Sequence, residues 1–169
     1  VEKYTPEQVA ALIQLVDPKF YPPSDEQSEI ISIKSNPLEP AVVIAGAGSG
    51  KTETMAFRVV YLVANGFVRP DQILGLTFTR KAAGELNVRI RKRLSQLLKA
   101  LKIEHERNGR GEFVAPFTIS NTSVTTYHSY AGRILSEHSI RLGIDADSQP
   151  LGEAALWMMA NRIVRNWDE

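Results

Sequence analysis

The sequence predicts an α/β fold in which a parallel sheet is flanked by helices. Short apolar runs rich in β-branched residues alternate with longer runs whose apolar residues recur at helical spacing. The glycine-rich stretch AGAGSGKTET (Ala45–Thr54) joins one apolar run to a helical run. The order strand, loop, helix, strand describes a βαβ unit, whose right-handed crossover makes its two strands parallel.

Two helices are expected before the first strand. The stretch TPEQ (residues 5–8) supplies an N-cap threonine, a proline at the first helical position and the glutamine of a capping box. The stretch SDEQ (residues 24–27) repeats this signal. Asp17-Pro18 ends the first helix, and the second continues to a break at Asn36-Pro37.

The remaining elements follow from the same patterns. Strands are predicted over residues 41–44, 73–79 and 124–127. Helices are predicted from the glycine-rich loop to Gly66, from Ala83 into the polar segment 104–111, over 129–142 with a stop at Gly143, and over 152–167. The long helix carries its apolar face on Ala83, Leu86, Ile90, Leu94, Leu97 and Leu101.

Composition excludes several classes of protein. The 169 residues include no cysteine, which excludes a disulfide scaffold and a cysteine-based zinc site. No apolar run is long enough to span a bilayer and no export signal is present, so we expect a cytoplasmic protein without a membrane partner. A net charge of +1 is too small to indicate nucleic-acid binding by itself.

The loop fits the phosphate-binding pattern GxxxxGK followed by Ser or Thr, with Ala45 in place of the first glycine. Small residues let successive backbone N–H groups turn toward phosphates at a helix N-terminus. The loop therefore predicts a P-loop NTPase in which Lys51 reaches the β and γ phosphates and the Thr52 hydroxyl coordinates Mg²⁺. The alternative is an accidental glycine-rich turn. The residues expected to hold the phosphates are Ala47, Gly48, Ser49, Gly50, Lys51 and Thr52.

Two later segments indicate which kind of P-loop NTPase this is. ILGLTFTRKAAGEL (residues 73–86) and TTYHSYAGRIL (residues 125–135) resemble motifs Ia and Ib of superfamily 1 DNA helicases of the UvrD/Rep type. Gln27 stands where that family has an adenine-reading glutamine, although it also completes a capping box. The resemblance covers roughly residues 21–142, and the wording GSGKTETM is most similar to the actinobacterial helicase-nuclease repair motors.

The resemblance implies a RecA-like motor domain that uses ATP and Mg²⁺. It implies coupling of ATP hydrolysis to movement on single-stranded DNA and duplex unwinding, in DNA repair, with 3′ to 5′ polarity. Lys51 and Thr52 are the expected catalytic residues, and Tyr21, Gln27 and Glu53 join the phosphate-loop residues at the nucleotide. The expected DNA contacts are Thr77, Phe78, Thr79, Arg80, Tyr127, His128 and Ser129.

Some of these side chains have simpler explanations. Without the resemblance, Phe78 would be a core residue and His128 a structural one. Glu53 and Arg80 depart from the family pattern. The basic residues Arg89, Arg91, Lys92 and Arg93 cannot all share one helix face, so we expect most of them to be solvated surface.

The predicted organisation is incomplete. Residues 1–20 form an N-terminal helical extension, residues 21–142 the first part of the motor domain with an insertion around 97–121, and residues 143–169 the start of an inserted helical subdomain. The second acidic motif and the arginine finger that such ATPases need are not recognised, because neither Asp145 nor Asp168-Glu169 follows a suitable apolar strand.

We therefore expect a fragment, inactive alone, of a longer helicase. Its expected partners are single-stranded and duplex DNA and the second motor domain of its own polypeptide, and a nuclease domain or subunit is a further candidate. The alternatives are a nucleotide-binding module or nuclease regulator without strand-separating activity, and a P-loop kinase for a small molecule.

Overall fold

A computed structural model describes residues 2–33, 40–109, 111–119, 123–143, 145, 148 and 151–167. The chain divides into two compact units, Val1–Tyr127 and His128–Glu169. The expected domain boundaries at residues 20 and 142 remain predictions.

The first unit begins with the two predicted helices, α1 (Pro6–Gln14) and α2 (Asp25–Ser32). Both capping boxes are confirmed, because Thr5 and Ser24 each exchange two hydrogen bonds with the glutamine three residues later. A reciprocal box satisfies two backbone N–H groups that the helix itself leaves unpaired. The predicted break at Asn36-Pro37 lies outside the described residues.

Two longer helices complete the helical part of this unit, α3 (Lys51–Ala64) and α4 (Arg80–Arg107). The predicted apolar stripe on α4 is confirmed from Ala83 to Leu97, and Leu101 is half-buried at its end. Gly66, just past α3, has a φ of 70° and ends the helix as predicted.

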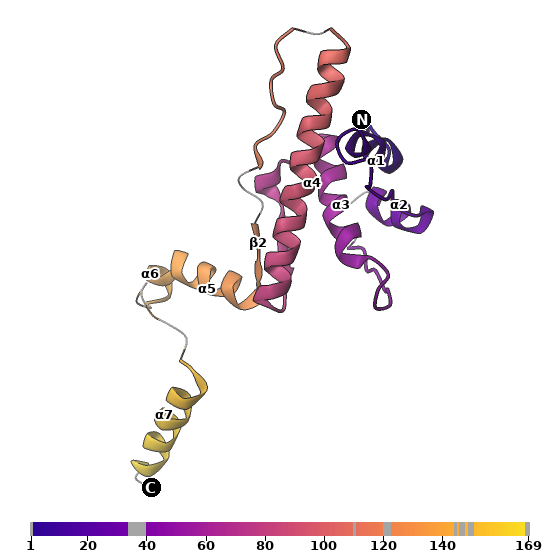
Figure 1. Cartoon of the computed structure of the whole chain (residues 1–169). Helices are drawn as coiled ribbons and strands as arrows, with labels where there is room; N and C mark the ends of the chain where they lie inside the picture. The colour runs from indigo at the N-terminus through magenta and orange to yellow at the C-terminus, as the bar shows by residue number, and fades with distance from the viewer. Residues whose placement is uncertain are drawn as a thin grey trace. The chain divides into compact units, whose positions relative to one another are not determined.

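The core of the first unit lies between helices. Figure 1 shows α1, α2 and α3 on one side of the long α4. Val9 and Ile13 of α1 are buried together with Phe57 of α3 and Leu94 of α4. Phe20 stacks on Phe57 with ring centroids 5.5 Å apart. Each fully buried side chain of this size stabilises the fold by about 1.5–3 kcal/mol, so these contacts hold the helices together.

A two-stranded parallel sheet packs against α4. Strand β1 (Leu74–Thr77) follows a short 3₁₀ helix, η1 (Pro70–Gln72), and pairs with β2 (Ser123–Thr126) so that Thr77 lies opposite Thr126. The predicted strand at 73–79 is confirmed in shorter form, and the one at 124–127 is confirmed with a shift of one residue. The strands approach closely at Gly75, since a Cβ on it would lie 3.2 Å from a methyl carbon of Val124.

The strand predicted over residues 41–44 is wrong. This segment has no strand structure, and its last residue, Ile44, is 96% exposed. A strand forms where a neighbour satisfies its backbone N–H and C=O groups, and within the described residues β1 pairs only with β2. The βαβ unit predicted across α3 is therefore absent, and the parallel pair observed is joined through α4.

The second unit contains α6 (Ser139–Leu142), α7 (Glu153–Arg165) and all but the first residue of α5 (Tyr127–Glu137). The single helix predicted over 129–142 is interrupted at His138, whose ψ of 11° departs from helical geometry. Gly143, at a φ of 65°, ends the segment as predicted. The predicted last helix is confirmed as α7. Within the described residues, no helix has the length and apolar character needed to cross a membrane.

Candidate nucleotide and nucleic-acid sites

The glycine-rich loop leads directly into the N-terminus of α3. Gly48 and Gly50 have φ values of 79° and 80°, a conformation that side chains with a Cβ rarely adopt, and Gly50 is the N-cap of α3. No heavy atom lies within 4 Å of a Cβ built on Gly46 or Gly48. The loop therefore offers open backbone at a helix N-terminus, where N–H groups and the helix dipole favour an anion.

Lys51 places its positive charge at the same loop. Its ammonium donates to the carbonyl oxygen of Ala45 at 3.0 Å and to that of Gly46, and the Ser49 hydroxyl donates to Gly46 at 2.9 Å. A compact cation at a helix N-terminus is suited to phosphate oxygens. The predicted phosphate-loop residues therefore come together in one place.

Thr52 lies exposed in the first turn of α3. A hydroxyl in this position fits one ligand site of a Mg²⁺ ion, which prefers oxygen. In the part of the chain that the structure describes, no group of three or more acidic or histidine side chains could hold a metal ion. A Mg²⁺ ion at Thr52 would need further oxygen ligands, such as phosphate oxygens and water.

Gln27 joins α2 to the loop. Its side-chain oxygen accepts from the backbone N–H of Ser24 at 3.1 Å, and its amide nitrogen donates to the carbonyl of Ser49 at 3.2 Å. The helix-capping role of Gln27 is confirmed, and its adenine-reading role remains a prediction. The matching residue of α1, Gln8, accepts from Thr5 in the same way.

A cleft of about 580 Å³ lies beside the loop, and Gln27, Ser49 and Lys51 line part of it. Its lining also includes Arg58, which the sequence analysis missed. Lys51 and Arg58 are seven residues apart on α3 and therefore share one helix face. This spacing is the sequence signal that could have indicated Arg58. The lining does not include Tyr21, whose exposed ring remains a predicted adenine contact.

Arg58 holds the C-terminal end of α2. Its guanidinium donates to the carbonyl oxygens of Ile30, Ile31 and Ile33 at 2.7–3.0 Å. A cation there satisfies carbonyls that the helix leaves unpaired. Burial lowers the pKa of Arg58 from its ordinary value. Arg58 thereby fixes α2, and with it Gln27, against the helix that follows the loop.

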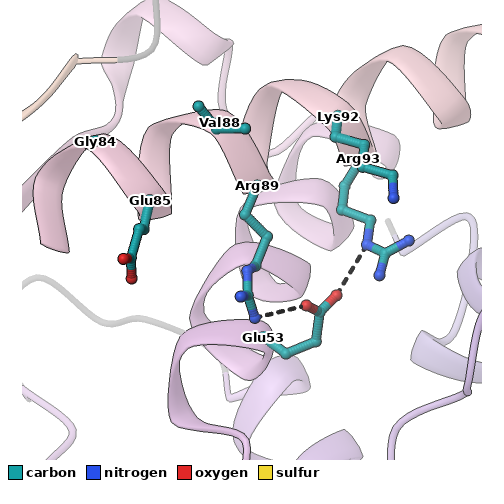
Figure 2. Close-up of a pocket in the computed structure, with 7 residues that line it drawn as sticks. All are labelled: Glu53, Gly84, Glu85, Val88, Arg89, Lys92 and Arg93. Atoms are coloured by element: carbon teal, nitrogen blue, oxygen red, sulfur yellow. Dashed lines mark hydrogen bonds and ion pairs between the residues drawn. The ribbon is translucent and has the colours of Figure 1, made fainter. Parts of the chain in front are cut away.

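Glu53 faces α4. Its carboxylate pairs with Arg89 and Arg93 (Figure 2). The sequence predicts that most of the four basic residues on this part of α4 are solvated surface, and these two are instead ion-paired with Glu53. They are four residues apart on one face of α4, which points toward α3. Arg91 and Lys92 are exposed, as predicted. Whether Glu53 also contacts a nucleotide remains a prediction.

The carboxyl ends of β1 and β2 bring two aromatic rings together. Thr77 and Thr126 are paired, and the next residues, Phe78 and Tyr127, have ring centroids 5.2 Å apart. Phe78 is 88% exposed and Tyr127 is 48% exposed. Phe78 therefore lies outside the core, and the pair offers aromatic surface at the edge of the sheet where α/β folds place ligands.

Thr79 and Arg80 continue from Phe78 into α4. Thr77 donates from its hydroxyl to the Thr79 carbonyl at 3.0 Å, and Thr79 caps α4 by accepting from the N–H of Ala82 at 3.1 Å. Arg80 is the first residue of α4 and is exposed. This helix N-terminus therefore combines the positive end of the helix dipole with an arginine, which suits a phosphate.

His128 and Ser129 occupy the first turn of α5 and are exposed. They directly follow Tyr127 in the chain and belong to the second unit. Their predicted contacts with DNA remain predictions.

Comparison with known proteins adds an independent observation. The model of the UvrD/REP helicase N-terminal domain family matches residues 24–167. DNA helicase II of Haemophilus influenzae is 30% identical over 148 residues, which are 86% of this chain and 18% of that protein. ATP-dependent DNA helicase PcrA of Staphylococcus aureus is 32% identical over 120 residues, 71% of this chain and 13% of that protein.

A shorter match has higher identity. ATP-dependent DNA helicase UvrD2 of Mycobacterium tuberculosis is 44% identical over 75 residues, which are 44% of this chain and 10% of that protein. The chain thus spans less than a fifth of the length of these relatives.

Proposed function

The chain belongs to the UvrD/Rep family of DNA helicases, and from this premise we propose that it is the ATP-binding portion of a longer DNA helicase or translocase. The parent protein would couple ATP hydrolysis to movement on single-stranded DNA and to unwinding of duplex DNA. The proposed fold is the first part of a RecA-like P-loop NTPase domain.

In this proposal the loop Ala45–Thr52 holds the ATP phosphates. The N-terminus of α3 and the Lys51 ammonium supply positive charge, and the Thr52 hydroxyl is a ligand for Mg²⁺. When bound, Mg²⁺ neutralises charge on the β and γ phosphates. Gln27 reads adenine, which its contact with Ser49 supports by placing the amide at the loop.

The DNA site comprises the seven residues predicted at the strand ends. Phe78 and Tyr127 would stack on bases, while the N-terminus of α4 and Arg80 would bind a backbone phosphate. His128 and Ser129, which belong to the second unit, would also contact DNA.

One observation carries the proposal beyond nucleotide binding. Phe78 and Tyr127 lie side by side and exposed at the ends of two paired parallel strands, in the same unit as the glycine-rich loop. Exposed aromatic pairs of this kind provide stacking platforms for single-stranded nucleic acid. A kinase for a small molecule has no use for such a surface, so this observation favours the motor.

The test is ATP hydrolysis by the full-length protein that carries this chain, with and without single-stranded DNA. We expect DNA to stimulate hydrolysis. Lys51→Ala should lower the rate by about 10²–10³, because the lysine no longer stabilises the negative charge that develops on the phosphate oxygens in the transition state. Lys99→Ala, which removes an exposed lysine of α4, is the matched control and should keep the stimulated rate.

Hydrolysis or tight ATP binding that is indifferent to DNA would favour the alternative, a nucleotide-binding module or nuclease regulator. DNA repair, 3′ to 5′ polarity, a second motor domain, a nuclease domain or subunit as partner, and a cytoplasmic location belong to the same proposal about the parent protein.

A further inference from the structure

We propose that Glu53 is a positioning residue that couples the glycine-rich loop to the DNA-facing strand ends through Arg89 and Arg93 of α4. This inference rests on the proposed function, since it concerns communication between a nucleotide and a DNA strand. The Glu53 ion-pair cluster, defined as Glu53, Arg89 and Arg93, carries the argument.

Each oxygen of the Glu53 carboxylate accepts from a different guanidinium. Arg89 Nη1 lies 3.0 Å from Glu53 Oε2, and Arg93 Nε lies 2.8 Å from Glu53 Oε1. Figure 2 shows both arginine side chains reaching from α4 to the carboxylate on α3. One carboxylate therefore fixes α3 to two successive turns of α4, which a single pair would not do.

Arg93 is held in place from several sides. Its Nη1 donates to Gln96 at 3.0 Å and lies 3.6 Å from a carboxylate oxygen of Asp17, and its guanidinium lies 4.3 Å from the Phe20 ring centroid. Its side chain is only 13% exposed. An exposed ion pair contributes little because water and salt screen it, but this arginine is largely removed from water.

The cluster connects the two candidate sites through rigid elements. Glu53 directly follows Thr52 in the first turn of α3, so a shift of the phosphate loop moves its carboxylate. Helix α4 begins directly after Phe78 and Thr79, and it runs unbroken through Arg89 and Arg93. A movement of the α3 N-terminus is therefore transmitted along one continuous helix to the strand ends.

The cluster lines an open groove of about 630 Å³, so one of its arginines can be replaced separately from the other. Arg89, which is 41% exposed, and the exposed Lys92 both line it. Arg89→Gln removes one ion pair of the cluster and leaves the partly buried Arg93 paired with Glu53. Lys92→Gln makes the same change of charge three residues away and is the matched control.

The experiment measures the affinity of the full-length protein for single-stranded DNA without nucleotide and with saturating ADP. The ratio of the two dissociation constants is the coupling factor between the sites. We expect Arg89→Gln to bring this ratio closer to one by about fivefold, which is at the low end of typical coupling. Arg89→Lys should restore part of the coupling that Arg89→Gln removes, and Lys92→Gln should leave the coupling factor at its wild-type value.

A merely structural role of Arg89 would lower thermal stability or change both affinities together, and the ratio would stay as in the wild type. That result, or equal ratios in Arg89→Gln and Lys92→Gln, overturns the inference. A wild-type protein that binds ADP and DNA with no coupling also overturns it but leaves the proposed function standing. A wild-type protein that binds neither ligand refutes the proposed function and the inference with it.

Discussion

At the scale of single residues, the exposure of the Phe78 ring distinguishes between its two possible roles, a surface for stacking and a position in the core. A phenylalanine gains about 1.5–3 kcal/mol on burial, yet this ring is almost fully exposed beside Tyr127. A folded domain that leaves such a ring in water forgoes that stabilisation. Its exposure is understandable where the ring has a ligand to cover it.

We predict that Phe78→Ala in the full-length protein weakens binding of single-stranded DNA by about 1–3 kcal/mol per stacked base. Because no charge is removed, the dependence of affinity on salt should keep its slope, whereas Arg80→Gln should reduce the slope by about one unit. Titration of a labelled oligonucleotide at several salt concentrations measures both quantities.

Phe67 provides the control for this prediction. It is 47% exposed, close to the exposure of Tyr127, and packs on Tyr61 at the other end of α3 from the glycine-rich loop. Phe67→Ala should leave DNA affinity unchanged. Equal losses in Phe67→Ala and Phe78→Ala would mean that Phe78 acts on stability and not on DNA.

At the scale of elements, α1 and α2 begin with the same local signal and differ in what lies beside it. Gln8 and Gln27 each complete a capping box, but the amide of Gln27 also donates to Ser49. The capping role could be predicted because it involves residues three positions apart. The contact with the loop joins residues 22 positions apart and depends on how α2 packs on α3.

This difference supplies a prediction with an internal control. Gln8→Ala and Gln27→Ala should each lose a backbone hydrogen bond worth about 0.5–1.5 kcal/mol of stability. Only Gln27→Ala should weaken ATP binding and reduce the preference for ATP over GTP, which competition binding to the full-length protein measures. Unchanged nucleotide affinity and preference in Gln27→Ala would restrict Gln27 to helix capping.

At the scale of the whole molecule, the 169 residues span a small part of their relatives and form two units. The carboxylate nearest to Thr52 in the chain, that of Glu53, is engaged by two arginines. It is therefore poorly placed to orient an attacking water. Phosphoryl transfer in P-loop enzymes also uses an arginine from across the cleft, which contributes roughly 10³–10⁵ in rate.

We predict that these residues, purified alone, bind a phosphate-bearing nucleotide at the loop but do not hydrolyse ATP above background, with or without DNA. Amide shifts on titration with ADP should move at Gly48–Thr52, and phosphate release should match that of Lys51→Ala. Clear turnover that this substitution abolishes would place the second acidic site within the chain, at Asp145 or at Asp168-Glu169.

The sequence by itself determined the features that depend on neighbours along the chain. These features are the capping boxes, the apolar stripe of α4 and the glycines that end helices. Their patterns involve residues close together in the chain, so they can be recognised in the sequence without tertiary information. The order of motifs likewise identified the family that the comparison with known proteins supports.

Only the tertiary structure decided which distant groups meet. Residues 41–44 have the composition of a strand, but a strand also needs a partner for its backbone, and composition cannot supply one. Arg89 and Arg93 look like surface charges until α3 crosses α4 and presents Glu53 to both. Ion pairs and sheets depend on the path of the chain through space, so their partners cannot be inferred from local sequence alone.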